Sequence, residues 1–261
     1  MKYKLIAFDI DGTILDASYN VCLRLKEVVA DLMSRGYLFV LVSARLPNSV
    51  LEIANELQLE GEVIALNGSF ITNRDNEIIL SQDFSIDRIE DILSNVDSRI
   101  AVNYYHNFDW YVANPSLFTT QEIEFVNSVP KIIEKFAINR ANKITLSGEY
   151  ERLLDIQKKF EKDATMLALF SHPNYLEVTC ASISKLNGLK HYSKLKQIKV
   201  EEIIAFGDGE NDIPMLSGVG LGIAMGNAKD HVKKIAKVII GNHYDQGVAK
   251  YLEELIVKGV L

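Results

Sequence analysis

Residues 5–13 of this chain are Leu5-Ile6-Ala7-Phe8-Asp9-Ile10-Asp11-Gly12-Thr13, an apolar run followed by two carboxylates and a glycine. The apolar run predicts a buried strand, and the Asp-Gly pair marks the turn that ends it. Side chains two residues apart on a strand point the same way, so we expect Asp9 and Asp11 to share one small volume. Bringing two like charges to ~4 Å costs about 4 kcal/mol at an effective dielectric constant of about 20, and a divalent cation is the expected compensation.

Two other interpretations fit a short Asp-X-Asp-Gly sequence. A solvated turn needs only the turn-forming Asp and Gly, and a single short match does not exclude it. A calcium loop of the EF-hand type also begins with Asp-X-Asp, but it needs Gly at its sixth position and Glu at its twelfth. The chain has Ile14 and Asn20 at these positions, which excludes the calcium loop.

The composition is that of an ordinary globular protein with one large or two modest domains, since 48% of the 261 residues are hydrophobic. The 28 Lys and Arg residues against 35 Asp and Glu residues give a net charge of -7, which argues against binding to nucleic acid or anionic membranes. No apolar stretch reaches the ~20 residues of a membrane span, so we expect a cytoplasmic protein. Cys22 and Cys180 have no metal-ligand spacing.

The first part of the chain alternates between strand and helix patterns. Apolar residues at helical spacing predict a helix over 21–33, with Gly36 where a C-cap glycine belongs. A strand at 38–42, a helix opened by Pro47 and a strand at 63–66 follow. Continuous apolar strands that alternate with helices indicate a parallel sheet covered on both faces.

The same alternation returns after residue 185, with strands predicted at 203–206, 221–225 and 238–240. Both ends of the chain are therefore expected to contribute to one doubly wound parallel sheet. The middle of the chain reads differently, because strands such as 100–105 and 110–112 are separated by short turns, with longer helices between them. We interpret this middle stretch as an antiparallel α+β insert.

Polar residues follow several predicted strands at the point where each strand ends. In doubly wound sheets, ligands bind beyond the carboxyl ends of the strands, so these residues are expected to lie together. They come from distant parts of the chain: Asp9, Asp11, Ser43, Asn67, Gly68, Asp208, Asn211 and Asp212. Coincidence explains such a group poorly, and a site for chemistry explains it well.

With these motifs the chain resembles the haloacid dehalogenase superfamily of phosphatases, and within it the Cof-type group with a large α/β cap. The resemblance covers essentially the whole length. It rests on the stretch Asp9 to Thr13, on Ser43 in a second motif, on Lys185 in a third, on Gly207-Asp208-Gly209-Glu210-Asn211-Asp212 in a fourth, and on Gly222-Ile223-Ala224-Met225-Gly226-Asn227-Ala228. It implies a Rossmann-like α/β core formed by residues 1–82 and 185–261, with residues 83–184 as the inserted cap.

The resemblance implies a covalent mechanism with Asp9 as the nucleophile that forms an aspartyl-phosphate. An aspartate with its ordinary pKa of about 3.9 is ionised at neutral pH and needs no base. Asp11 is implied as the acid that protonates the leaving oxygen and then deprotonates the attacking water. For that role Asp11 must hold a proton near neutrality, which neighbouring negative charge favours.

The resemblance also implies Mg²⁺, held by the hard oxygen ligands of Asp9, Asp208 and the backbone carbonyl of Asp11. Asp212 is expected either among these metal ligands or just behind them. Asn211 is expected either to donate to the substrate or to orient Asp208.

Ser43 and Lys185 are implied as catalytic residues that bind the phosphate, the first through its hydroxyl and the second through its charge. Further substrate contacts are expected from Arg45, Asn67, Gly68 and Asn211, with Tyr104, His106 and Trp110 as candidates in the cap. Two positions depart from the family pattern. Ala44 replaces the usual Gly of a Thr-Gly-Arg motif, and Leu186 follows Lys185 where Gly is common, so that Lys190 is the alternative lysine.

The function implied is an Mg²⁺-dependent phosphomonoesterase that acts on a small phosphorylated metabolite. A sugar phosphate is the first candidate, with nucleotides such as flavin mononucleotide and with pyridoxal phosphate as others. A phosphomutase with the same core is the alternative enzyme, and a phospho-acceptor signalling module is a second alternative. We expect a monomer or a weak homodimer that binds neither nucleic acid nor membranes.

Overall fold

A computed structural model describes residues 2–16, 18–126 and 128–261, and contacts between residues divide the chain into two compact units. Unit 1 comprises Met1–Ala44, Val50–Ile79 and Ser184–Leu261, and unit 2 comprises Arg45–Ser49 and Leu80–Ile183. The divisions at 79/80 and 183/184 lie close to the positions 82/83 and 184/185 expected from the sequence. The grouping of Arg45–Ser49 with unit 2 has no counterpart in the sequence pattern.

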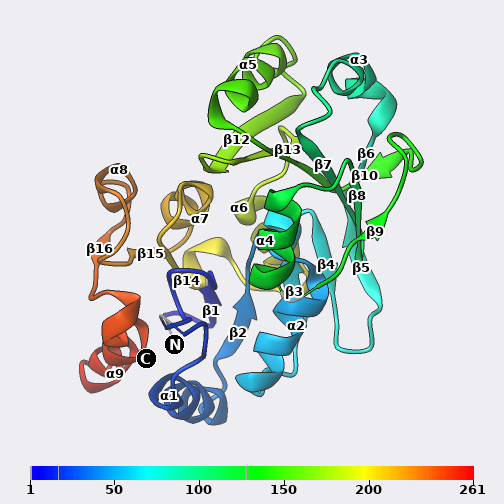
Figure 1. Cartoon of the computed structure of the whole chain (residues 1–261). Coiled ribbons are helices and arrows are strands. Elements are labelled where there is room, and N and C mark those ends of the chain that lie inside the picture. Colours follow the sequence, from blue (N-terminus) through cyan, green and yellow to red (C-terminus); the bar gives the residue numbers. More distant parts are fainter. Residues whose placement is uncertain (1, 17, 127) are drawn as a thin grey trace. The chain divides into compact units, whose positions relative to one another are not determined.

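Unit 1 is built on a five-stranded parallel sheet with the order β16-β15-β14-β1-β2 (Figure 1). Its strands are β1 (Leu5–Phe8), β2 (Leu38–Leu41), β14 (Ile203–Gly207), β15 (Leu221–Ala224) and β16 (Val238–Ile239). Because β1 pairs with β2 on one side and with β14 on the other, both ends of the sequence contribute to one sheet, as predicted.

The central strands of this sheet form the core of unit 1. β1 and β14 are buried along their whole length, as expected of strands covered on both faces. Phe8 stands opposite Phe206 on β14 and Leu41 on β2 in the strand register. The three strands therefore end at the same level, and the residues that follow them lie along one edge of the sheet.

The helices of unit 1 cover the sheet from two sides. They are α1 (Leu23–Ser34), most of α2 (Pro47–Glu56), α6 (Lys185–Leu195), α7 (Ile213–Gly218), α8 (Asp230–Lys233) and α9 (Gly247–Val257). The α1 helix packs against α9, and α6 packs against α7, with the two pairs on opposite sides of the strands (Figure 1). The helices predicted over 21–33 and from Pro47 are confirmed.

A small three-stranded sheet completes unit 1. Its strands are β3 (Val63–Ala65), β4 (Phe70–Thr72) and β5 (Ile78–Ser81), the last of which ends in unit 2. The turn between β3 and β4 holds Asn67 and Gly68 at positive φ, 58° and 96°. This left-handed backbone suits Asn and Gly, and it turns the chain at the same sheet edge as the ends of β1 and β14.

Unit 2 is built on a six-stranded sheet with the order β12-β13-β11-β7-β8-β9. Its strands are β7 (Ala101–His106), β8 (Asp109–Ala113), β9 (Lys131–Ile132), β11 (Lys143–Ser147), β12 (Met166–His172) and β13 (Tyr175–Cys180), and β6 (Phe84–Ser85) pairs separately with β10 (Arg140–Ala141). The neighbouring strands are antiparallel except β8 and β9, which agrees with the α+β insert predicted here.

The two faces of this sheet differ in chemistry. Alternate residues such as Tyr104, Ile144 and Leu146 join an apolar cluster, whereas their neighbours Asn103 and Thr145 point to the opposite face. The helices of unit 2 are α3 (Glu90–Ser94), α4 (Leu117–Val126) and α5 (Tyr150–Phe160), and residues of α3 and α5 belong to the apolar cluster. Within the ranges described, no helix is both long and apolar enough to cross a bilayer.

Candidate active site

Asp9 directly follows β1, and only 4% of its surface is exposed. Its backbone N–H donates to the Phe206 carbonyl at 3.0 Å, which joins the end of β1 to β14. The Thr13 hydroxyl donates to Asp9 Oδ2 at 3.0 Å, and Lys185 Nζ donates to Asp9 Oδ1 at 2.5 Å. Both oxygens therefore have donors that hold the carboxylate in one orientation.

Lys185 is the buried cation of this group, with 1% of its surface exposed. The Ser184 side chain accepts a hydrogen bond from the Asn187 N–H, so Lys185 is the first residue of α6. Burial alone would lower the pKa of Lys185, but Asp212 and Asp9 raise it by more, and the amine stays protonated. The alternative lysine, Lys190, is exposed on the same helix.

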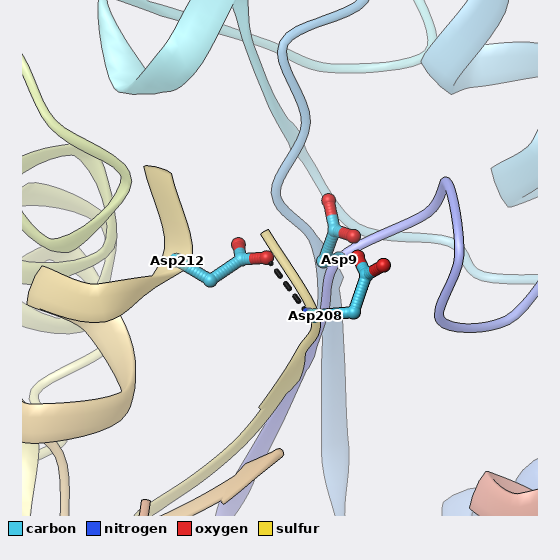
Figure 2. Close-up of side chains that lie close together, drawn as sticks. All are labelled: Asp9, Asp208 and Asp212. Atoms are coloured by element: carbon cyan, nitrogen blue, oxygen red, sulfur yellow. Dashed lines mark hydrogen bonds between the residues drawn. The ribbon is translucent and has the colours of Figure 1, made fainter. Parts of the chain in front are cut away.

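Asp212 is fully buried, and its carboxylate accepts three hydrogen bonds. Oδ1 accepts from Lys185 Nζ at 2.6 Å. Oδ2 accepts from the backbone N–H groups of Asp208 at 3.0 Å and of Gly209 at 2.9 Å (Figure 2 marks the bond to Asp208). Asp212 therefore fixes both the turn that carries Asp208 and the ammonium group of Lys185.

Asp208 follows β14 and packs against the turn that follows β1. Asn227 Nδ2 donates to Asp208 Oδ2 at 3.0 Å and to the Gly12 carbonyl at 2.8 Å. Gly12 has φ 73°, and a Cβ atom there would lie 2.3 Å from Asp208 Oδ2. Only glycine meets both conditions, which explains its place in the first motif.

The carboxylates of Asp9, Asp208 and Asp212 offer oxygens that all lie within 4.8 Å of one another (Figure 2). Burial and the charge of Asp212 raise the pKa of Asp9 well above its ordinary value, against the opposing effect of Lys185. Burial and Asp212 likewise raise the pKa of Asp208 to about 6. Three carboxylates beside one ammonium leave surplus negative charge, and such hard oxygen donors fit a divalent cation such as Mg²⁺.

Two expectations about the first motif are corrected here. The β1 strand ends at Phe8, and Asp11 lies in a turn over residues 11–14, so Asp9 and Asp11 are not neighbours on one extended strand. The carboxylates grouped with Asp9 are those of Asp208 and Asp212, while Asp11 acts electrostatically on Asp208. The ordinary pKa expected for Asp9 is also wrong, because burial and Asp212 raise it.

Ser43, Asn67 and Asn211 are brought together beside the carboxylates, as the sequence predicted for strand ends. Ser43 is buried; its N–H donates to the Ile64 carbonyl, and its own carbonyl accepts from the Asn67 N–H, both at 2.9 Å. Asn211 Nδ2 donates to Asn67 Oδ1 at 3.0 Å. Three predicted residues from distant motifs thus form one hydrogen-bonded network.

The departures from the family pattern are accommodated without strain. Ala44 is not among the residues with positive φ, so its methyl group does not burden the backbone. Gly188 lies against Gly68, since a Cβ atom on Gly188 would be 2.7 Å from Gly68 Cα. The small residue that this close approach requires therefore stands three positions after Lys185, and Leu186 fits against Gly218.

Four residues named as candidates for substrate contact belong to unit 2. Arg45 lies in the segment that groups with unit 2. Tyr104 is fully buried in the apolar cluster of unit 2, so the expectation of a substrate contact is wrong for it. His106 Nε2 lies 3.2 Å from Asp83 Oδ2, and Trp110 is buried. For Arg45, His106 and Trp110 a substrate contact stays a prediction.

Sequence reasoning gave no role to three residues that hold the carboxylates, two of them directly and one through a neighbour. Thr13 binds Asp9 from one turn further along the chain, Asn227 binds Asp208, and the backbone of His243 binds Asn227 at 3.2 Å. Asn227 lies in a segment typical of the Cof-type group, and this was the sequence signal that could have identified it as a site residue. His243 carries no such signal, and its contact with Asn227 uses only the backbone N–H.

Comparisons with known proteins agree with this geometry. A family model described as haloacid dehalogenase-like hydrolase matches residues 6–252. A Haemophilus influenzae protein named "Putative phosphatase" is 31% identical over 97% of this chain and 98% of its own length. A solved haloacid dehalogenase-like hydrolase from Bacteroides thetaiotaomicron has a TM-score of 0.84 at 26% identity, covering 97% of this chain and 100% of that one.

A solved sugar phosphatase of the same superfamily, subclass IIB, has a TM-score of 0.83 over 97% of this chain and 98% of its own. At 21% identity it shows a likeness of fold. The family match spans nearly the whole chain, including most of β1, all of α6 and the turn that carries Asp208 and Asp212. The chain therefore belongs to the haloacid dehalogenase-like hydrolases and is a phosphatase of that superfamily.

Proposed function

We propose that this phosphatase hydrolyses the phosphate monoester of a small metabolite with Mg²⁺, through an aspartyl-phosphate on Asp9. The observation that carries the proposal is the contact between Asp9 and Lys185 beside the carboxylate of Asp208. A nucleophile held at both oxygens, next to a buried cation and a second carboxylate, suits attack on an anionic phosphate.

The metal would be held by Asp9 and Asp208, with the backbone carbonyl of Asp11 as a further ligand. Asp212 stands behind them in this proposal, because its oxygens already accept from Lys185 and from two backbone N–H groups. When bound, Mg²⁺ offsets the charge of the carboxylates and polarises a phosphate oxygen. Removal of that surplus charge also favours the ionised Asp9 that the mechanism needs.

The chemical steps assign one task to each aspartate of the first motif. A carboxylate oxygen of Asp9 attacks phosphorus, the bond from phosphorus to the ester oxygen breaks, and Asp11 gives its proton to that leaving oxygen. Asp11 then takes a proton from water, whose oxygen attacks the phosphorus of the aspartyl-phosphate. Asp9 is released as a carboxylate together with inorganic phosphate.

Lys185 and the turns around it supply the positive and polar surroundings of the phosphate. The ammonium of Lys185 lets one anion approach another, and Asp212 holds it in place. Ser43, Asn67, Gly68 and Asn211 are the proposed phosphate contacts, since their network lies at the same sheet edge. Arg45 is a proposed contact to the substrate from the segment after Ser43.

We further propose that unit 2 is the cap and that it recognises the part of the substrate beyond the phosphate. A sugar phosphate is the first candidate substrate to test. The likeness in fold to the solved protein named a sugar phosphatase supports this choice. The enzyme would act as a monomer or weak homodimer. A phosphomutase remains the alternative reaction of the same core.

The test is phosphate release from a panel of sugar phosphates, nucleotides and pyridoxal phosphate, with Mg²⁺ and with a chelator. Mass spectrometry of acid-quenched enzyme should find one phosphoryl group on a peptide containing Asp9, and none in Asp9→Asn. Formation of an isomeric phosphate ester, without release of inorganic phosphate, would instead show that the enzyme is a phosphomutase. If no ester is hydrolysed with Mg²⁺ present, or a phosphoryl group is found on another residue, the proposal fails.

A further inference from the structure

Asn227 connects the two loops that carry the proposed metal ligands. It lies in the turn after β15, and its single amide nitrogen donates both to the Gly12 carbonyl at 2.8 Å and to Asp208 Oδ2 at 3.0 Å. Gly12 directly follows Asp11 in the first motif, and Asp208 belongs to the fourth. One side chain therefore spans from the loop after β1 to the loop after β14.

A hydrogen bond to the amide oxygen of Asn227 fixes the orientation of this amide. The backbone N–H of His243 donates to Asn227 Oδ1 at 3.2 Å, so the nitrogen of the amide must face Gly12 and Asp208. The Met225 N–H donates to the Gly207 carbonyl at 3.0 Å, which fixes the turn against β14. Both donors and the acceptor of the amide are used, and the side chain is half-buried.

A second contact ties the same segment to the loop after β1. His243 Nδ1 lies 2.7 Å from the Leu15 carbonyl, which can only accept, so Nδ1 carries the proton. His243 thereby holds the loop after β1 directly through its ring and holds Asn227 through its backbone. Asn227 and His243, which lie outside the group of carboxylates, therefore set the separation between the loop after β1 and Asp208.

We propose that Asn227 is a positioning residue that orients the Asp208 carboxylate, and fixes its distance from the Asp11–Gly12 turn, for the binding of Mg²⁺. The inference rests on the proposed function, because it concerns the cation assigned to that site. Asp208 Oδ2 lies close to Gly12, where a Cβ atom would be 2.3 Å from it, and the same oxygen accepts from the amide donor. Asn227 touches neither substrate nor phosphate in this role.

The choice of an amide has a chemical reason. A neutral donor holds one carboxylate oxygen in place and leaves the full negative charge of Asp208 available to attract a cation. A lysine or arginine in the same place would neutralise that charge, and an aspartate would add a further anion without a donor. A serine hydroxyl carries a single proton and cannot donate to both Gly12 and Asp208.

The test measures Mg²⁺ binding by isothermal titration calorimetry without substrate, in the wild type, Asn227→Ala and Asn227→Ser. Both variants lose the double donor, and we expect the Kd for Mg²⁺ to rise by about 10- to 100-fold, as for other residues that orient metal ligands. With saturating Mg²⁺, KM for the phosphate ester should stay within about 2-fold of the wild type, since Asn227 orients a metal ligand and does not bind the ester.

Asn73→Ala is the matched control. Asn73 is another half-buried asparagine of unit 1, whose Oδ1 accepts from the backbone N–H groups of Asp75 and Glu77 and whose Nδ2 donates to the Glu77 carboxylate at 2.7 Å. Its loss should lower the unfolding temperature and leave the Kd for Mg²⁺ unchanged. A rise in Kd equal to that of the Asn227 variants would show a general loss of structure and would overturn the inference.

The outcomes separate this inference from the proposed function. If the wild type binds Mg²⁺ and releases phosphate, but either folded Asn227 variant binds Mg²⁺ with the wild-type Kd, only the positioning role is overturned. If the wild type binds Mg²⁺ without hydrolysing any ester, the proposed function fails. The ratio of the variant Kd to the wild-type Kd for Mg²⁺ then still decides the role of Asn227. If the wild type binds no Mg²⁺, both are overturned.

Discussion

Lys185 places its ammonium nitrogen 2.5 Å from Asp9 Oδ1, and both side chains are buried. The same nitrogen lies 2.6 Å from Asp212 Oδ1, so one cation serves two carboxylates inside the protein. Breaking a buried ion pair from one side leaves uncompensated charge in a medium that solvates it poorly. Lys185 is therefore needed for the stability of unit 1 as well as for the proposed chemistry.

We expect Lys185→Met to abolish phosphate release and to lower the free energy of unfolding by about 3–5 kcal/mol in urea titrations. Added Mg²⁺ should recover part of this loss, because a cation bound by Asp9 and Asp208 would again offset the negative charge of the group. Lys190→Met, on the same helix but exposed, is the control and should change stability by less than about 0.5 kcal/mol. Equal stabilities of the two variants would contradict the buried pair.

Asp9→Asn should separate activity from stability. Removing the proposed nucleophile should lower kcat by at least about 10⁴-fold, a loss comparable to that for nucleophiles in other covalent enzymes. In metal-free protein the variant should melt at a higher temperature, because burial and Asp212 penalise the charged form of Asp9. Calorimetry with a chelator measures this, with the exposed Asp75→Asn as control. A lower melting temperature would show that Lys185 outweighs these penalties.

Gly12→Ala tests the close packing between the first motif and Asp208. At φ 73° an alanine is strained by about 1–2 kcal/mol, and its Cβ atom would also meet Asp208 Oδ2 at 2.3 Å. Gly259→Ala has the same kind of backbone, φ 66°, with nothing within 4 Å of the added atom. We expect Gly12→Ala to lose more stability than Gly259→Ala in urea titrations and to bind Mg²⁺ more weakly. Equal losses of stability in the two variants would mean that the positive φ alone, and not the contact with Asp208, requires glycine at position 12.

The binding of Mg²⁺ should weaken as the pH falls through about 6. Burial and Asp212 raise the pKa of Asp208 to about 6 in the metal-free protein, so protons compete with the cation below that pH. Titration calorimetry between about pH 5 and 8 measures the change, with proton release appearing as a dependence on the buffer. A Kd that stays constant over this range would contradict the raised pKa.

The raised pKa of Asp208 has the opposite consequence for the folding stability of the metal-free protein, which increases as the pH falls. The folded protein holds its proton on Asp208 more tightly than the unfolded chain does, so protonation stabilises the folded state. Metal-free stability should therefore fall as the pH rises from the unfolded value of 3.8 to about 6. Thermal melts with a chelator should show this decline, and Mg²⁺ should remove it.

The sequence predicted that several residues of the candidate site lie together, because strand ends are readable from local pattern. Asp9, Ser43 and Asp208 each follow a buried apolar run, and parallel pairing of those runs brings the three ends to one edge. Lys185 was predicted from the order of the family's motifs, since a lysine at the start of a helix has no local signature. The contacts of Lys185 with two carboxylates depend on side-chain geometry, which spacing alone does not specify.

Three features lay outside what local pattern determines. The carboxylates grouped with Asp9 are those of Asp208 and Asp212, about 200 residues away along the chain. The raised pKa of Asp9 follows from burial, which depends on the packed tertiary structure. Tyr104 was a candidate for a substrate contact in the cap, but strand alternation places it on the apolar face of the unit 2 sheet.

The position of β1 between β2 and β14 has a consequence for the biosynthesis of the enzyme. A ribosome makes β1 and β2 early, but β14 is synthesised about 200 residues after β1. Until then one side of β1 has no partner strand, and Asp9 has neither Lys185 nor Asp208 beside it. A nascent chain thus carries Asp9 long before it carries Lys185 and Asp208, the residues that lie beside it in the folded protein.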